Sequence, residues 1–391
     1  MGNRVQQQKR SAFAPETKLR RLTRGLATPL YLYDEKSLLS NAQALFTAFS
    51  WNPDFREYLP LQRCCNPALL HIMQTAGCGV LCSDFAQLQM AERCGFAAEQ
   101  LLYAPAVHHT QAEALAAQLD ATWVIDGEHV LPLKPPRRVI LRYNPGGRLR
   151  ADGRSLANFD RIKYGMRDEE LLQMVRRFAA QETESIGLML SACENSLDPA
   201  YYPAIAKTLF GLAVQVQARL DVRISVCNLA GGFGISSRTE YASPDIKIAA
   251  DRIHALYDEI LVPAGLGMMR LQTALDRYLL ADTAVLISSV TAVRERELPT
   301  CLIDAVFEQS MLSGKHHSVC SLSTGSKREL GLYCVIGCQD SLRGGLSEGC
   351  VLPAPQPGDR LLIQMAGFDE IPWGTQVYLL RADGTLEEIG S

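Results

Sequence analysis

The sequence predicts a (β/α)8 barrel followed by an all-β domain, and two patterns indicate this. Between residues 28 and 270, short apolar runs alternate with helical patterns, which is typical of parallel strands joined by crossover helices. About eight such units in about 250 residues correspond to one barrel. After residue 270, strand-like runs are divided by Gly, Pro and Ser, and no long helical pattern separates them. This second pattern favours a separate β-domain.

The element boundaries follow from the same patterns. Asp34 is placed to cap a helix whose apolar face carries Leu38, Leu39 and Ala42, and Asn66 begins another helix. The predicted barrel strands are 28–34, 58–61, 79–82, 101–104, 122–125, 139–145, 185–190 and 224–227. Further helices are predicted at 84–94, 111–119, 168–180, 199–219 and 245–262, and β-domain strands at 278–293, 300–305, 332–336, 360–364 and 375–380. We divide the chain into a basic leader (1–27) that contributes to the β-domain, a barrel (28–270) and a β-barrel or sandwich domain (271–391).

The composition excludes several classes of protein. A chain of 391 residues with 47% hydrophobic content suits two domains with sizeable cores. No run of about 18 apolar residues occurs, so we expect no membrane-spanning helix. Residues 1–25 are basic and lack the apolar core of a signal peptide, and a net charge of −3 gives no case for nucleic acid. Twelve scattered cysteines favour free thiols in the cytoplasm.

The most distinctive stretch is a predicted strand that runs into a glycine-rich turn. It reads Val226-Cys227-Asn228-Leu229-Ala230-Gly231-Gly232-Phe233-Gly234-Ile235. Glycines let a backbone turn sharply, and they also let its N–H groups approach an anion such as a phosphate. A tight structural turn and an anion-binding turn therefore both remain open from this stretch alone.

Several other short motifs occur along the chain in a characteristic order and spacing. They are Thr28-Pro29-Leu30-Tyr31, Asn66-Pro67-Ala68-Leu69-Leu70, Arg142-Tyr143-Asn144-Pro145-Gly146, Lys163-Tyr164-Gly165, Ala230-Gly231-Gly232-Phe233-Gly234, Asp304-Ala305 and Pro357-Gly358-Asp359. With these runs the chain resembles the fold-type-III decarboxylases that depend on pyridoxal phosphate (PLP), such as diaminopimelate and ornithine decarboxylases. The resemblance implies the alanine racemase/decarboxylase fold, with PLP at the C-terminal mouth of the barrel. It also implies a β-domain that completes the site and two subunits that pair head to tail.

The chain departs from this family where the chemistry needs particular groups. The resemblance places the Schiff-base lysine four residues before Asn66-Pro67, and that position is Gln62. An amide is not a nucleophile and forms no aldimine, and the neighbouring Arg63 stays protonated. The carboxylate that keeps the pyridine ring protonated aligns with Ala274, although Asp276 lies two residues further on.

Three further departures follow from the same alignment. The ring-stacking histidine aligns with Ser191, and a tyrosine near the cofactor phosphate aligns with Phe368. The substrate-side cysteine given by the partner subunit aligns with Asp340, and Cys338 lies two places earlier. Five departures at the cofactor on a retained scaffold favour a repurposed fold.

The candidate site residues lie at strand ends or in the loops that the resemblance assigns to the site. Cys338 and Asp340 are the candidate catalytic residues. The candidate ligand-binding residues are Gln62, Cys64, Ser191, Gly231, Gly232, Gly234 and Arg277. We predict no metal site. Cys64, Cys193 and Cys227, together with Cys338, are candidate ligands for a soft metal, and the alternative is that they are small apolar fillers.

Three hypotheses about function remain open. The first is an enzyme that keeps an amino-acid-derived, carboxylate-bearing or phosphorylated ligand but uses no PLP. The second is a non-catalytic subunit that pairs with an active paralogue. The third is an active amino-acid decarboxylase that holds PLP without a covalent bond. We expect no cofactor, or PLP only as a non-covalent ligand, in a cytoplasmic homodimer or heterodimer that binds neither nucleic acid nor membrane.

Overall fold

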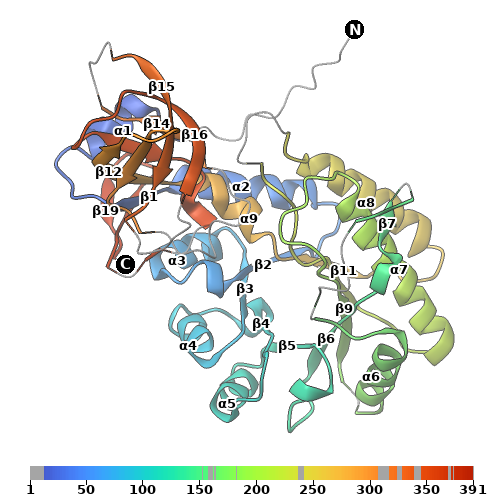
Figure 1. The fold of residues 1–391 in the computed structure, drawn as a ribbon. Helices are drawn as coiled ribbons and strands as arrows, with labels where there is room; N and C mark the ends of the chain where they lie inside the picture. The colour runs from blue at the N-terminus through green and yellow to red at the C-terminus, as the bar shows by residue number, and fades with distance from the viewer. Residues whose placement is uncertain are drawn as a thin grey trace. The chain divides into compact units, whose positions relative to one another are not determined.

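The chain forms two compact units (Figure 1). The computed structural model describes residues 13–151, 153–156, 162, 164–181, 183–236, 242–306, 317–323, 328–338, 345–368, 371–372 and 374–390. One unit contains Ala42–Ile235 and Ser243–Tyr278, and the other contains Met1–Asn41, Ser236–Ala242 and Leu279–Ser391. We call them the barrel unit and the sheet unit.

The barrel unit is a closed barrel of eight parallel strands, in the order β10-β11-β2-β3-β4-β5-β6-β9. The strands are β2 (Arg56–Pro60), β3 (Gly79–Cys82), β4 (Leu101–Tyr103), β5 (Thr122–Ile125), β6 (Arg138–Arg142), β9 (Ser185–Met189), β10 (Val226–Asn228) and β11 (Arg270–Thr273). Their inward-facing side chains fill the barrel with an apolar cluster that includes Tyr58, Val124 and Val226. This confirms the predicted fold class.

Helices surround the strands on the outside of the barrel (Figure 1). They are α3 (Pro67–Thr75), α4 (Phe85–Arg93), α5 (Thr110–Gln118), α6 (Asp168–Ala180), α7 (Tyr201–Leu220) and α8 (Ile246–Ile260). Several begin at capping side chains that accept hydrogen bonds from the first turn, namely Asn66, Asp84 and Asp245. A short hairpin, β7 (Arg150–Ala151) and β8 (Arg154–Ser155), follows β6. None of the described helices is both long and apolar enough to span a bilayer.

The sheet unit is built on a nine-stranded sheet. Its strands are β1 (Leu30–Asp34), β12 (Ala284–Arg294), β13 (Thr300–Ile303), β14 (Val319–Ser321), β15 (Leu330–Ile336), β16 (Gly345–Pro353), β17 (Arg360–Ile363), β18 (Gln376–Leu380) and β19 (Leu386–Glu388). Helix α1 (Glu16–Leu22) contributes Leu19 to a core formed with Leu30, Leu32 and Val285. Helices α2 (Glu35–Ala48) and α9 (Asp276–Leu280) contain two of the points at which the chain passes between the units.

Three sequence predictions about the barrel and its boundaries need correction. The strand that we predicted to begin the barrel is β1, which instead pairs with β12 and β18. The eighth barrel strand is β11, which crosses the boundary predicted at residue 270. A short strand that is buried along its whole length has the same pattern in either sheet, because burial does not specify the pairing partner. In addition, residues 276–283 are helical where we predicted the start of a strand.

Candidate ligand site at the barrel mouth

The glycine turn after β10 is packed tightly against the loop that follows β9. A Cβ atom at Gly232, whose φ is +93°, would lie 2.4 Å from the carbonyl oxygen of Cys193, and one at Gly234 would lie 2.3 Å from that of Ser196. A Cβ atom at Gly231 would lie 2.8 Å from the carbonyl oxygen of Ala274. Each glycine is therefore required by close approach of the protein's own backbone.

Several N–H groups of this turn donate within the protein. The amide of Ala230 donates to the Asn228 side chain at 2.8 Å, and that of Gly234 donates to the Ser196 carbonyl at 2.9 Å. The Ile235 amide donates to the side chain of Asn195 at 2.9 Å. These contacts supply the structural explanation for the turn, and they join the ends of β9, β10 and β11 into one rim.

The position of Gln62 is the short 3-10 helix Leu61–Arg63, directly after β2. The Gln62 side chain is exposed and that of Arg63 is half-buried, whereas Cys64 is buried. Burial raises the pKa of the Cys64 thiol to about 12. Cys64 is thus a neutral thiol at physiological pH rather than a thiolate nucleophile.

Asp276 begins α9, three residues after the end of β11. It is half-buried, and its Oδ1 atom accepts a hydrogen bond from the Arg277 amide at 2.8 Å. Burial raises the pKa of Asp276 to about 6. The guanidinium groups of Arg63 and Arg277 lower this pKa in part, whereas the carboxylate of Glu194 raises it further. Two cations and two carboxylates from the ends of β2, β9 and β11 therefore interact at one side of the mouth.

A second charged group lies at the ends of β5 and β6. A guanidinium nitrogen of Arg142 lies 3.4 Å from an Asp126 carboxylate oxygen, and the guanidinium carbon lies 4.9 Å from the centre of the Tyr164 ring. Asp126 also accepts a hydrogen bond from the Gly165 amide at 2.8 Å. The predicted site residues did not include Arg142 and Asp126, although their positions at strand ends are the signal that finds them.

The remaining candidates lie in β10 and in the loop after β9. Ser191 and Cys193 are half-buried in the loop after β9, and Cys227 is buried in β10 with its pKa raised by burial. No group of three or more His, Cys, Asp or Glu side chains suited to a metal occurs among the residues that the structure describes. All twelve cysteines are free thiols.

Cys338, one of the two candidate catalytic residues, belongs to the sheet unit. Cys338 is exposed, its amide donates to the Ala305 carbonyl at 2.9 Å, and its thiol lies 3.3 Å from the Asp304 carbonyl. Asp340 lies outside the described residues. Phe368 is buried in the 3-10 helix Ala366–Phe368.

Sequence reasoning missed one buried acid, Glu57. It is the second residue of β2 and has no exposed surface. Burial raises its pKa to about 8, and hydrogen bonds from Thr273 and from the Leu275 amide oppose that shift. A carboxyl group in this state is protonated at neutral pH.

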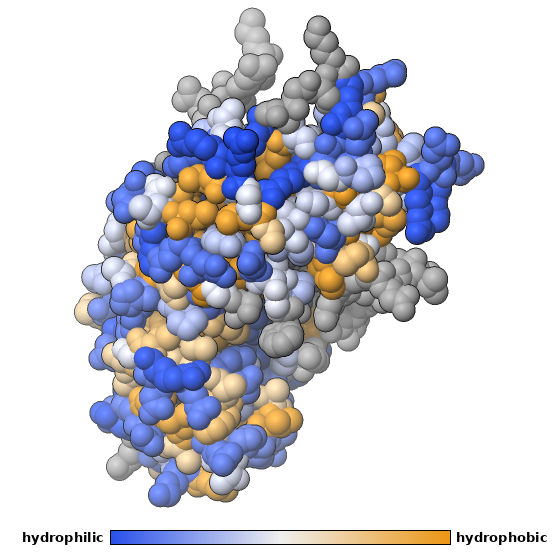
Figure 2. All heavy atoms as spheres, turned by 90° about the vertical axis from the view of Figure 1, so that its left-hand side faces the viewer, coloured by the Kyte–Doolittle hydropathy of each residue, from blue (hydrophilic) through white to orange (hydrophobic). Residues whose placement is uncertain are grey.

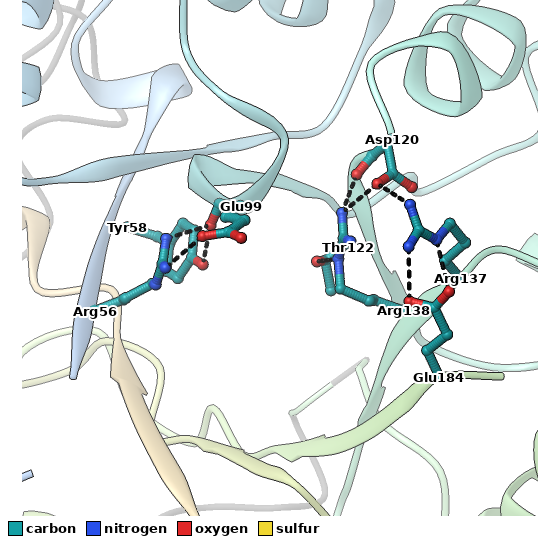
Figure 3. Close-up of polar contacts among 8 residues, drawn as sticks. All are labelled: Arg56, Tyr58, Glu99, Asp120, Thr122, Arg137, Arg138 and Glu184. Atoms are coloured by element: carbon teal, nitrogen blue, oxygen red, sulfur yellow. Dashed lines mark hydrogen bonds and ion pairs between the residues drawn. The ribbon is translucent and has the colours of Figure 1, made fainter. Parts of the chain in front are cut away.

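The opposite end of the barrel carries paired charges. Arg56 forms an ion pair with Glu99 at 2.7 Å, and the Tyr58 hydroxyl donates to the Glu99 carbonyl at 2.8 Å (Figure 3). Arg138 contacts Asp120 and Thr122, and Arg137 joins Asp120 to Glu184 (Figure 3). These residues lie at the N-terminal ends of the strands, and we call them the barrel floor.

Comparison with known proteins identifies the family. The family model described as the pyridoxal binding domain of pyridoxal-dependent decarboxylases matches residues 46–269. The chain belongs to the pyridoxal-dependent decarboxylase family. The matched region contains every barrel strand except β11, so the family is assigned on the barrel that carries the mouth described above.

Members of this family resemble the chain over most of its length. Diaminopimelate decarboxylase of Deinococcus radiodurans is 27% identical over 347 residues, which cover 87% of this chain and 84% of that protein. L-glutamyl-[BtrI acyl-carrier protein] decarboxylase of Niallia circulans is 23% identical over 417 residues, covering 94% and 92% of the two chains. The crystal structure of diaminopimelate decarboxylase from M. jannaschii superposes with a TM-score of 0.85 at 16% identity, covering 95% and 91%.

Proposed function

We propose that this chain binds an amino-acid-derived carboxylate ligand at its barrel mouth and acts on it without a covalent bond to PLP. PLP, when bound, supplies an electron sink for amino-acid chemistry. The family binds this cofactor through its barrel domain, so the proposal concerns a change within an established family. The observation that carries it is the amide side chain of Gln62 at the end of the first barrel strand.

The lysines that the structure describes in the barrel unit do not fit a covalently held pyridoxal. Those that the structure describes are Lys134, Lys207 and Lys247. All three are exposed, and none of them directly follows a barrel strand. Lys207 lies on the outer helix α7, and Lys247 forms an ion pair with Asp251 at 2.7 Å. Lys163 lies outside the described residues.

The charges at the mouth suit a zwitterion. A guanidinium group binds a carboxylate through two parallel hydrogen bonds, and Arg63 and Arg277 offer two such groups. Asp276 and Glu194 offer carboxylates for an ammonium group. The equal number of opposite charges favours an α-amino acid over a simple dicarboxylate, and the relatives named above act on amino-acid derivatives.

The titration of Asp276 sets a lower pH limit for this site. Because its pKa is raised to about 6, its carboxyl group is protonated at pH 5 and ionised at pH 7. We expect an amino acid to bind more weakly below pH 6, where the ammonium group loses this partner.

A partner subunit is also proposed, because the β15–β16 hairpin presents apolar side chains to solvent. Leu330 and Leu332 are two residues apart on β15 and so share one face of the strand, and Val351 on β16 pairs with Leu332. The exposed fractions of Leu330, Leu332 and Val351 are 66%, 51% and 64%. Figure 2 shows apolar surface interspersed with charged side chains on the face that it displays. Contiguous exposed apolar residues favour a subunit contact, with a second copy or with an active paralogue.

Light scattering tests the partner. We expect a dimer for the purified chain, or a complex when an active relative is present, and we expect Leu332→Asp to reduce it to a monomer. A chain that is monomeric with and without the relative would contradict this part of the proposal.

Calorimetric titration and a turnover assay test the main proposal. L-lysine, meso-diaminopimelate and L-glutamate are titrated into the protein with and without added PLP, and carbon dioxide release is followed in parallel. We expect at least one amino acid to bind in the absence of PLP. Carbon dioxide release that requires PLP, with the yellow absorbance of an aldimine, would show an active PLP decarboxylase and overturn the proposal.

A further inference from the structure

Glu57 lies at the seam where the barrel closes. In the pairing of the first barrel strand, β2, with the last, β11, Glu57 is directly opposite Thr273. The side chains alternate along β2, and Tyr58 belongs to the interior cluster, so Glu57 points away from the barrel interior. It is nevertheless completely buried, and a buried carboxyl group needs hydrogen-bond partners.

Both oxygens of the carboxyl group contact the end of β11. One is hydrogen-bonded to the Thr273 hydroxyl, and the other accepts a hydrogen bond from the Leu275 amide at 2.5 Å. The next two residues are Asp276 and Arg277, which carry charge at the mouth. Glu57 therefore holds the chain immediately before these two residues.

The glycine turn holds the same segment from the other side. The Ala274 amide donates to the Ala230 carbonyl at 2.9 Å, and the Ala274 carbonyl lies against Gly231. Tyr202 donates to the same Ala230 carbonyl at 2.5 Å. The three residues Thr273 to Leu275 are thus fixed between Glu57 and the turn.

We propose that Glu57 is a positioning residue, whose buried carboxyl group fixes the segment Thr273–Leu275 and thereby places Asp276 and Arg277 at the barrel mouth. No sequence motif assigns a role to this residue. The inference rests on the proposed function in one respect: Asp276 and Arg277 are taken to bind the ligand.

The surroundings of Glu57 make this contact sensitive to pH. The titratable groups that act on it or respond to it are Asp276 at the start of α9, Cys78 before β3 and Tyr202 on α7. All three are acids, so none compensates a negative charge on Glu57. Loss of the Glu57 proton places a second carboxylate beside Asp276, and this buried charge without a cation disfavours the arrangement in which Glu57 is covered.

Hydrogen exchange of the isolated chain tests the inference without any ligand. The peptide that contains residues 273–278 is followed from pH 6 to pH 9.5 in the wild type, Glu57→Gln and Glu57→Leu, with α8 as the internal reference. The closed state keeps the Glu57 proton up to about pH 8, whereas an open state releases it near the ordinary value of 4.5. We therefore expect the wild-type protection factor to fall about tenfold per pH unit from pH 6 to about pH 8 and to be level above that pH. Glu57→Gln keeps both hydrogen bonds and cannot ionise, so its protection should not change with pH.

Glu57→Leu should lose protection in this peptide at every pH, because the Leu275 amide then has no acceptor. If that variant does not fold, the comparison of wild type with Glu57→Gln still decides. Identical pH profiles for these two proteins would overturn the inference. Amino-acid titrations repeated at pH 7 and pH 9 give the functional result, and absence of binding at both values would count against the proposed function alone.

Discussion

The two ends of the barrel treat acidic side chains in opposite ways. At the floor, the guanidinium group of Arg56 lowers the pKa of Glu99, and the acid is permanently ionised at neutral pH. At the mouth and beneath it, burial raises the pKa of Asp276 to about 6 and that of Glu57 to about 8. Glu99 at the floor is therefore ionised well below neutral pH, whereas Asp276 and Glu57 titrate close to neutral pH.

This difference agrees with the general division of labour in such barrels. Active sites lie at the C-terminal ends of the strands, while the N-terminal ends contribute to stability. An acid whose pKa lies near neutrality is a marker of a functional site. The mouth of this chain has that property, because the pKa of Asp276 is raised to about 6.

The largest expected effect concerns Glu57. Its pKa is about 8 in the folded chain against an ordinary value of 4.5, so the folded state holds this proton more tightly than the unfolded state. Its contribution to stability is fully present below pH 4.5 and is lost as the pH rises to about 8, by roughly 5 kcal/mol. We expect the free energy of unfolding of Glu57→Gln, measured in urea, to lack this decline. Equal slopes for the two proteins between pH 5 and pH 8 would contradict the protonated state.

The next effect sharpens the view that the glycine turn is structural. Gly232→Ala introduces a Cβ atom 2.4 Å from the Cys193 carbonyl at a positive φ, and we expect it to cost about 2–3 kcal/mol. Gly211 lies inside α7, where an added Cβ atom would meet nothing within 4 Å, so Gly211→Ala should stabilise the chain by about 0.5–1 kcal/mol. Thermal unfolding compares the two, and a neutral Gly232→Ala would mean that the loop after β9 moves freely.

A third comparison sets an arginine of the mouth against one of the floor. Arg277→Gln removes a guanidinium from the ligand site, so we expect amino-acid affinity to fall about 10–100-fold. Arg56→Gln breaks the ion pair with Glu99 at the floor and should leave that affinity unchanged. The same calorimetric titration measures both, and equal losses would show that the ligand does not use the mouth.

The smallest effect is expected at the floor itself. The Glu99 side chain is 69% exposed in its ion pair with Arg56, and such pairs contribute less than about 1 kcal/mol. Since the pKa of Glu99 is lowered, this small contribution is present at neutral pH and disappears as the pH falls below its ordinary range. Urea unfolding of Glu99→Gln at pH 7 should differ little from the wild type, and a large loss would mean that the floor is more than an exposed network.

The sequence predicted the barrel because its strands and helices alternate with a strong and regular period. It did not predict that β1 belongs to the sheet unit, because the pattern of a short buried strand does not specify which strand it pairs with. The basic leader was expected to contribute to the β-domain, and Leu19 of α1 packs in the core of the sheet unit. The local sequence pattern thus predicts where strands and helices form, whereas the sheet to which a strand belongs depends on long-range pairing.

The candidate site was predicted less completely. The strand ends after β2, β9 and β10 were found through motifs, but Glu57 was not, because a single acid in a strand usually points to solvent. Only the three-dimensional pairing of β2 with β11 shows that Glu57 is covered and that it holds Leu275. A buried acid of this kind can be identified only from the structure, once the strand pairing that closes the barrel is known.

Reduction with borohydride in the presence of one equivalent of PLP tests the central claim most directly. Reduction converts an aldimine into a stable adduct, which peptide mass mapping assigns to a residue, Lys163 included. We predict no stoichiometric adduct on any lysine of the wild-type chain and an adduct at position 62 in the variant Gln62→Lys. A stoichiometric adduct on a wild-type lysine would contradict the account.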